Sequence, residues 1–203
     1  MKPIVVDLEM SGIDFVKCGI WQIGAIDLET KEEFFDECRI DDEDKYLDGG
    51  DKPLIEVIGK TEEELRDSNK QSQKELLEKF FNWVKTRKMK TLVCQNPTFD
   101  IGFLWTKSKK YRLEIPFHHR SFDTHSIAHT KYFEMKKEFL IEDKDFSELG
   151  LKNILKMCGM EDNRKAHNAL EDAKLTAECF SRLMFGEKLL KEYSEFEIPE
   201  ELK

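Results

Sequence analysis

The first forty residues alternate between apolar runs and short polar breaks, a pattern typical of strands. Residues 4–10 begin with three adjacent β-branched side chains, which predicts a buried strand that ends near residue 10. A longer apolar run over 20–28 predicts a second strand, and residues 33–40 predict a third. Because only residues 29–32 separate the last two, we expect them to form an antiparallel hairpin.

Helical signals follow these strands. Residues 61–64 and 72–75 each carry a Ser/Thr-x-x-Glu capping box, which predicts a helix N-terminus, and apolar spacing after the second box predicts a longer helix. Residues 54–59 are expected to form one short helix. The acidic segment 41–51, which precedes them and contains Gly-Gly, is expected to be an exposed loop.

The second half of the chain alternates strands with helices. We expect a buried strand over 91–95 that turns into a helix, an extended piece ending at 122–123 before another helix, a helix capped by Ser147, and a long last helix over 168–185. A hairpin group followed by such alternation predicts an α/β fold, with a central mixed five-stranded sheet and helices on both faces.

Length and composition indicate one domain with a tail. A chain of 203 residues, 39% apolar and with 15 Phe, can bury one substantial core but hardly two. We expect the domain to occupy residues 1–186. Residues 187–203 have mixed charges and are expected to form a C-terminal tail that packs partly or stays flexible.

The charge balance restricts the kind of partner. A net charge of −9 argues against a broad, non-specific nucleic-acid-binding surface, but it is compatible with a local basic rim around a metal-filled acidic pocket. The basic cluster at 107–112 is expected to be a solvated helix end. The alternative is that this cluster guides a nucleic-acid strand.

Cysteine usage and hydropathy indicate the compartment. The five cysteines form an odd set without a Cys-x-x-Cys pair, as expected for reduced thiols in the cytoplasm. No signal peptide opens the chain, and no apolar run approaches the roughly 20 residues that span a bilayer. We therefore expect a cytoplasmic protein without membrane contact.

Two carboxylates, Asp7 and Glu9, stand at the end of the first predicted strand. Residues i and i+2 of a strand point to the same face, so these two side chains are expected side by side. Adjacent carboxylates repel, and a shared proton or a bound cation relieves the repulsion. Oxygen ligands favour a hard ion such as Mg²⁺ or Mn²⁺. The alternative is a frayed strand end with solvated acids.

Asp100 and Asp172 are two further candidate ligands, and His167 is a candidate base. Asp100 lies in the first helical turn after a predicted strand, where an acid also interacts favourably with the helix dipole. Asp172 borders alanines at 169, 173 and 177, a spacing that lets a helix lie close to a sheet. His167 is five residues from Asp172, so it reaches the same site only from the loop before the helix.

Three segments together resemble the motifs of one enzyme family. Residues 6–12 (Val-Asp-Leu-Glu-Met-Ser-Gly), followed by Trp-Gln-Ile-Gly at 21–24, resemble the first motif of the DEDDh, or DnaQ-like, 3′→5′ exonucleases. Residues 96–104 resemble the second motif, with Asn before Phe-Asp, and residues 167–173 resemble the third, His-x-Ala-x-x-Asp-Ala. The family includes the DNA polymerase III epsilon proofreading subunit, RNase T and oligoribonuclease, and the resemblance implies an RNase H-like fold.

The resemblance implies a metal-dependent 3′→5′ exonuclease. Asp7, Glu9, Asp100 and Asp172 would hold two divalent ions, Mg²⁺ or Mn²⁺, and His167 would take the proton of the attacking water. The enzyme would hydrolyse phosphodiester bonds at the 3′ end of single-stranded DNA or RNA and release nucleoside 5′-monophosphates.

The same resemblance implies which residues contact the terminal nucleotide. Backbone groups around Met10, Ser11 and Gly12 would approach this nucleotide, and Leu8 or Met10 would lie with Phe99 against its base or sugar. Asn96 is a further expected contact. Stacking of this kind suits trimming of single strands without sequence preference.

Two alternatives stay open from the sequence. An oligoribonuclease-like enzyme would be restricted to short RNA, and a catalytically silent domain would bind nucleic acid without cleaving it. A DNA polymerase is a candidate partner, for which residues 187–203 are the only candidate docking segment. The sequence leaves the oligomeric state and the choice between DNA and RNA open.

Overall fold

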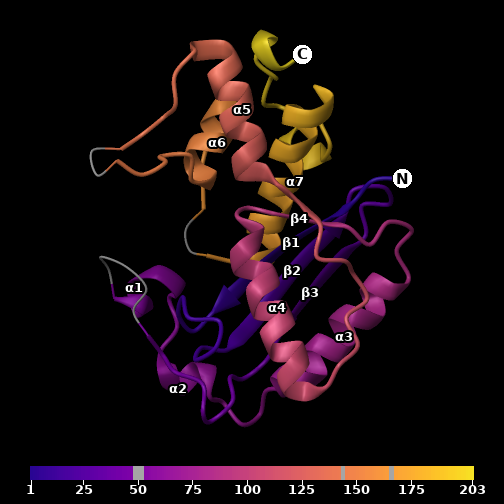
Figure 1. Cartoon of the computed structure of the whole chain (residues 1–203), viewed down its shortest axis with the longest axis vertical. Coiled ribbons are helices and arrows are strands. Elements are labelled where there is room, and N and C mark those ends of the chain that lie inside the picture. The colour runs from indigo at the N-terminus through magenta and orange to yellow at the C-terminus, as the bar shows by residue number, and fades with distance from the viewer. Residues whose placement is uncertain (48–52, 143–144, 165–166) are drawn as a thin grey trace.

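The computed structural model describes residues 1–47, 53–142, 145–164 and 167–203 and is built on a five-stranded sheet (Figure 1). The strand order is β3-β2-β1-β4-β5. β1 pairs with β2 and β2 with β3 in antiparallel fashion, whereas β1 pairs with β4 and β4 with β5 in parallel fashion. The predicted mixed sheet is therefore confirmed. The strands are β1 (Ile4–Met10), β2 (Ile20–Asp27), β3 (Glu33–Glu37), β4 (Leu92–Cys94) and β5 (Ser121–Asp123).

The helices begin where the sequence signals predicted, with one exception. Both capping boxes are formed, with Thr61 and Ser72 as the N-cap residues. The exception is Ser147, because the next helix has Gly150 as its N-cap and the Ser147 hydroxyl instead contacts His125 and His129. The helices are α1 (Leu54–Ile58), α2 (Glu62–Leu65), α3 (Gln73–Lys85), α4 (Pro97–Tyr111), α5 (Thr124–Lys136), α6 (Leu151–Met157) and α7 (Ala169–Phe185).

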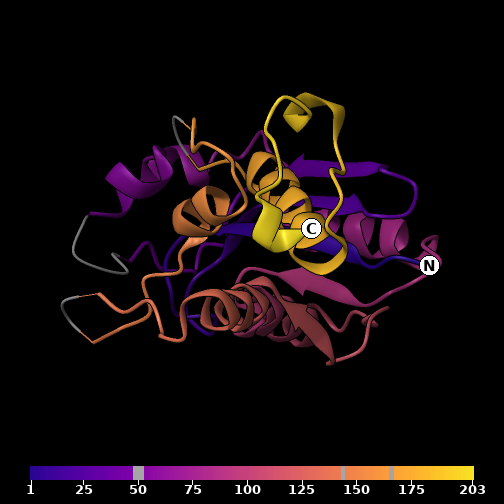
Figure 2. The same cartoon turned by 90° about the horizontal axis from the view of Figure 1, so that it is seen from above.

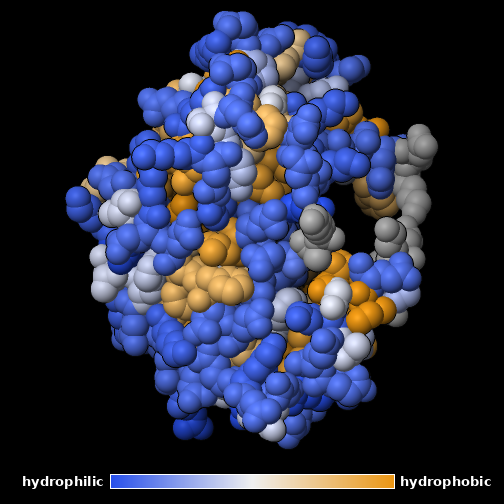
Figure 3. Space-filling view, turned by 180° about the vertical axis from the view of Figure 1, so that it is seen from behind, coloured by the Kyte–Doolittle hydropathy of each residue, from blue (hydrophilic) through white to orange (hydrophobic). Residues whose placement is uncertain are grey.

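Helices cover both faces of the sheet, as the alternation of strand side chains requires. Val6 and Leu8 of β1 belong to a core cluster with side chains of α3 and α4, and Figure 1 shows α4 crossing in front of the strands. Val5 points to the opposite face and packs with Ala173 and Ala177 of α7. Helices α5 and α6 form a third cluster with α7. Hydrophilic residues cover most of the face shown in Figure 3.

Helix α7 lies unusually close to β2 at its first turn. A Cβ atom built on Gly24 would lie 2.1 Å from the backbone carbon of Ala169, so only a glycine fits at this position of β2. The predicted stripe of small residues explains the contact, because Ala169, Ala173 and Ala177 are all fully buried. The N-terminus of α7 is thereby held against the strand next to β1.

The segment after α7 folds back beside that helix (Figure 2). Glu178 and Arg182, both fully buried, form an ion pair of 2.8 Å inside α7. The Glu178 carboxylate accepts the backbone N–H groups of Leu189 and Leu190, and Arg182 donates to the carbonyl of Tyr193. Four apolar side chains of the segment are buried as well: Leu189, Leu190, Ile198 and Leu202.

Two expectations about charged segments are wrong. The acidic segment 41–51 is not wholly an exposed loop, because Asp44 is 2% exposed, and residues 48–51 of it lie outside the described residues. The basic cluster at 107–112 is not wholly solvated, because Lys107 is 1% exposed. Both errors have one cause: Asp44 and Lys107 pair with each other inside the protein.

Two further observations concern the cysteines and the apolar character of the helices. The five cysteines, all within the described part of the chain, are free and buried. Among the described residues, no helix combines the length and the apolar character needed to cross a bilayer.

Candidate active site

The carboxyl end of β1 carries the first two predicted ligands. Glu9 is 6% exposed, and Asp7 on the same face is partly buried. Burial raises the pKa of the Asp7 carboxyl well above its ordinary value, and the neighbouring charges of Asp100, Glu9 and Asp172 raise it further. Burial likewise raises the pKa of Glu9 to about 7. The structure therefore brings the four predicted carboxylates into one electrostatic cluster.

Asp100 reaches this cluster from α4. Asn96 adopts a left-handed conformation that turns the chain from β4 into α4, so Asp100 falls in the first turn of the helix. The backbone N–H of Leu8 donates to Oδ1 of Asp100 at 3.1 Å, which ties α4 to β1 between the two acids of the strand. Burial raises the pKa of Asp100 to about 8.

Asp172 and His167 reach the cluster from the start of α7. Asp172 is 3% exposed, and Nδ1 of His167 lies 3.3 Å from its Oδ2 and 3.8 Å from Oε1 of Glu9. Ligand atoms of Glu9, His167 and Asp172 all lie within 4.8 Å of one another. The hydrogen bond to Asp172, followed by the charge of Glu9, raises the pKa of His167. His167 thus lies in the loop before the helix, the only place from which it could share the site.

This donor set fits hard divalent cations. Buried carboxylates at neutral pH need a compensating positive charge, and four oxygen donors with one imidazole are ligands that Mg²⁺ and Mn²⁺ accept. Burial is the main cause of the raised pKa values of Glu9 and Asp100, and a cation bound between these carboxylates would lower them.

Gln22 contacts the helix that carries Asp172, and the sequence analysis did not single it out. Its side-chain Oε1 accepts the backbone N–H of Ala169 at 2.7 Å, and its amide nitrogen donates to Glu37 at 2.7 Å. Gln22 thereby fixes the first turn of α7, from which Asp172 projects. The signal was present, because Gln22 is a polar residue within an otherwise apolar strand and within the first motif.

Arg164 is a second residue that was missed. Its Nη1 lies 3.0 Å from Oδ1 of Asp172, and the same guanidinium pairs with Asp162 at 2.8 Å. Arg164 therefore holds a positive charge at the edge of the carboxylate cluster. Nothing in the sequence indicated this contact, because Arg164 lies in a charged segment without periodicity.

The residues predicted to contact the substrate differ in how exposed they are. Leu8 is 5% exposed and its side chain belongs to the core, so of the alternatives Leu8 and Met10 only Met10 has accessible surface. Ser11 is fully buried. Phe99 is partly exposed and packs on Phe103, with ring centroids 6.0 Å apart. Asn96 is exposed beside the start of α4. Gly12 has φ +148°, and its position is described further below.

The comparison with protein families decides the class of the chain. A family model described as exonuclease matches residues 4–180. The chain belongs to this exonuclease family. The resemblance that the three motifs indicated is therefore confirmed, and the site residues quoted for it lie within the matched range.

Individual relatives of this exonuclease agree with that assignment. Ribonuclease T of Vibrio parahaemolyticus is 26% identical to this chain, and the match covers 88% of this chain and 83% of the relative. Among solved structures, the nuclease domain of 3′hExo, a DEDDh family member bound to rAMP, has a TM-score of 0.63 at 19% identity and covers 98% of this chain and 96% of that domain. The RNase H-like fold is thereby confirmed.

A second solved structure bears on metal and substrate. The zinc-bound complex of E. coli Exonuclease I with single-stranded DNA has a TM-score of 0.64 at 20% identity, and the match covers 91% of this chain and 41% of that chain. Enzymes of the family depend on divalent metal ions.

Proposed function

We propose that this exonuclease removes nucleotides from the 3′ end of single-stranded nucleic acid and releases nucleoside 5′-monophosphates. One observation carries the proposal: carboxylates from β1, α4 and α7 converge with an imidazole at the end of the sheet, although they come from positions 7 to 172 of the chain. Buried charges are normally paired or coordinate metal ions, and a carboxylate cluster that holds metal ions is a common arrangement for the hydrolysis of a phosphodiester.

The four carboxylates of Asp7, Glu9, Asp100 and Asp172 would hold two divalent ions, Mg²⁺ or Mn²⁺. When bound, such ions activate water for attack on the phosphorus and stabilise the negative charge that develops on the leaving 3′ oxygen. The protein contributes the arrangement of the ligands. The Leu8 N–H fixes Asp100, and Gln22 fixes the helix turn that carries Asp172.

His167 would take the proton from the attacking water. Its side chain is 48% exposed, and its Nδ1 faces Glu9 and Asp172, so the ring borders both the carboxylate cluster and solvent. An imidazole accepts a proton near neutral pH. Hydrogen bonding to Asp172 raises the pKa of His167, and only the neutral ring accepts a proton, so activity is expected to rise with pH as His167 loses its proton.

The terminal nucleotide would lie against Met10 and Phe99. Both side chains are partly exposed, one at the end of β1 and the other in the first turn of α4, next to the buried acids. Stacking on such side chains tolerates any base, which agrees with an enzyme that trims single strands. Relatives that hold single-stranded DNA support this substrate class, and the choice between DNA and RNA is decided by the assay.

The test follows short and long 5′-labelled DNA and RNA single strands with Mg²⁺ or Mn²⁺. We expect a ladder that shortens from the 3′ end and disappears in Asp172→Asn, while the matched variant Glu171→Gln, which changes an exposed carboxylate beside Asp172 on α7, keeps activity. Cleavage confined to the shortest RNA would replace the proposal by an oligoribonuclease-like activity. Intact strands of every kind at high enzyme concentration would overturn it.

A further inference from the structure

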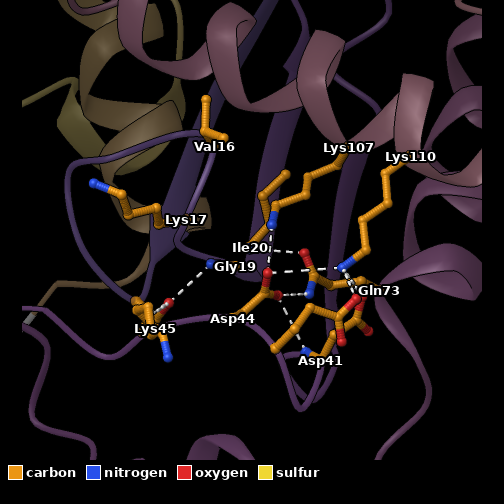
Figure 4. Close-up of polar contacts among 12 residues, drawn as sticks. Val16, Lys17, Gly19, Ile20, Asp41, Asp44, Lys45, Gln73, Lys107 and Lys110 are labelled. Carbon is orange, nitrogen blue, oxygen red and sulfur yellow. Dashed lines mark hydrogen bonds and ion pairs between the residues drawn. The ribbon is translucent and has the colours of Figure 1, made fainter.

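A buried ion pair between Asp44 and Lys107, which are not part of the carboxylate cluster, lies beside Gly19 and Ile20 at the start of β2 (Figure 4). Nζ of Lys107 in α4 lies 2.6 Å from Oδ1 of Asp44, and their side chains are 1% and 3% exposed. Lys110 lies farther away, 3.7 Å from the same oxygen. Burying two charges costs several kcal/mol per ion, which is offset only where geometry and further hydrogen bonds are good.

The Asp44 carboxylate has these further bonds. Its Oδ2 accepts the side-chain amide of Gln73 at the start of α3 and the backbone N–H of Asp41 at 3.1 Å. Gln73 in turn accepts the N–H of Ile20, the first residue of β2, at 3.0 Å. A Cβ atom on Gly19 would lie 2.4 Å from the Asp44 carboxylate, so the carboxylate packs directly on the backbone before β2.

The segment that Asp44 anchors is hydrogen-bonded directly to Ser11. The next residue, Lys45, accepts the Ser11 hydroxyl at its carbonyl (2.6 Å), and the Ser11 Oγ accepts the N–H of Gly19 at 2.8 Å. The Ser11 backbone donates to the carbonyl of Gly19 and accepts the N–H of Leu47, both at 2.9 Å. Every polar group of Ser11 is therefore held by residues that flank Asp44 or pack against it.

Gly12 shows how tightly this turn is enclosed. A Cβ atom there would lie 2.7 Å from both Sγ of Cys18 and the carbonyl oxygen of Leu47, and its φ of +148° is unfavourable for other residues. The turn lies one residue after Met10 and two after Glu9. A shift of the 41–47 segment would therefore move the end of β1, where the terminal nucleotide is proposed to bind.

We propose that Asp44 and Lys107 are positioning residues for the substrate turn at Ser11 and Gly12. Apolar pairs of similar volume often match buried ion pairs in stability, but here an apolar pair could not accept the two directional bonds from Gln73 and Asp41 that fix the segment. Lys107 lies on the helix whose first turn carries Asp100, about 10 Å along its axis. Helix α4 thereby positions both the proposed metal ligand Asp100 and, through Lys107 and Asp44, the turn that faces the nucleotide. The inference rests on the proposed function.

The first test measures steady-state kinetics on a single-stranded oligonucleotide. Lys107→Met removes the pairing cation, and we expect KM to rise roughly tenfold or more while kcat at saturating substrate stays within about threefold. The matched control is Lys109→Met, an exposed lysine two residues along the same helix, which should change neither constant. Because Lys107→Met leaves the buried Asp44 carboxylate with Lys110, 3.7 Å from it in the wild type, as its remaining cation, the double variant Lys107→Met/Asp44→Leu is also compared, at a temperature well below its Tm. We expect the double variant to keep the raised KM, because a leucine side chain cannot accept the bonds from Gln73 and Asp41.

The second test needs no activity and so separates this inference from the proposed function. In the protein without substrate, amide hydrogen exchange at Ser11, Gly19 and Leu47 should accelerate in the double variant, while exchange in the centre of α7 stays unchanged. Raised KM together with faster exchange at these amides supports positioning. Unchanged KM and unchanged exchange in the double variant would overturn it and reduce the ion pair to a contribution to stability. A wild-type protein that cleaves no strand refutes the proposed function instead, whatever the exchange shows.

Discussion

Removing divalent ions and raising the pH should destabilise this protein, because its buried acids keep their protons in the folded state. Burial raises the pKa of Glu9 to about 7 and that of Asp100 to about 8, whereas carboxyls of an unfolded chain titrate near 4. Between these values the folded state binds more protons than the unfolded state, so the free energy of unfolding falls as pH rises. The stabilisation is complete below about pH 4 and is lost as the pH passes the folded pKa values.

The magnitude follows from the two shifts. Each group lowers the free energy of unfolding by about 1.4 kcal/mol per pH unit within its window, so Glu9 and Asp100 together remove on the order of 5 kcal/mol between about pH 5 and 7. For a domain of this size, each kcal/mol shifts the Tm by roughly 2–4 °C. We expect the Tm in EDTA to fall by roughly 10 °C or more over that range.

The assay is thermal unfolding in EDTA at a series of pH values, repeated with excess Mg²⁺. Bound ions offset the repulsion, so the Tm with Mg²⁺ should depend much less on pH. Asp100→Asn keeps an oxygen that accepts the Leu8 N–H but cannot ionise, so in EDTA near pH 8 it should melt above the wild type while losing activity. A wild-type Tm in EDTA that stays level or rises from pH 5 to 8 would refute the reasoning.

Three further substitutions test individual contacts. His167→Ala should lower kcat by roughly 10²–10⁴-fold while calorimetry still detects divalent-ion binding; a loss of only a few-fold would show that another group takes the proton. Gln22→Leu leaves the buried N–H of Ala169 without its acceptor, so urea unfolding should show a loss of about 1–3 kcal/mol, together with reduced kcat, and wild-type kcat would contradict its positioning role. Glu178→Ala leaves the fully buried Arg182 without its carboxylate partner and should lower the free energy of unfolding by about 3–5 kcal/mol in the same measurement. A loss below about 1 kcal/mol would count against a firmly docked C-terminal segment.

Features with local causes could be predicted from the sequence. The capping boxes at 61–64 and 72–75 depend on residues three apart, and Gly186 ends α7 in a left-handed conformation for reasons contained in its own backbone. The pairing of Asp7 with Glu9 on one face follows from the period of a strand. The convergence of Asp100 and Asp172 was expected from the motif resemblance, since no local rule joins positions 72 residues apart.

The errors concern contacts between distant charges. Asp44 and Lys107 are 63 residues apart, each within a run of charged residues that is typical of solvated surface, and only the folded chain shows that the two cancel each other. The third strand was predicted to reach residue 40 but ends at Glu37, since its pairing with β2 ends there. In both cases contacts between distant parts of the chain determined the structure, and local composition carries no information about such contacts.

The order of the ligands along the chain has a consequence for synthesis. Translation delivers Asp7 and Glu9 first, then Asp100, and later His167 and Asp172 together with the helix that covers Val5 and its face of the sheet. Until α7 is synthesised, the nascent chain lacks two groups of the site and leaves that apolar face of the sheet uncovered. The cutting centre of this nuclease is therefore completed only when α7 docks on the sheet.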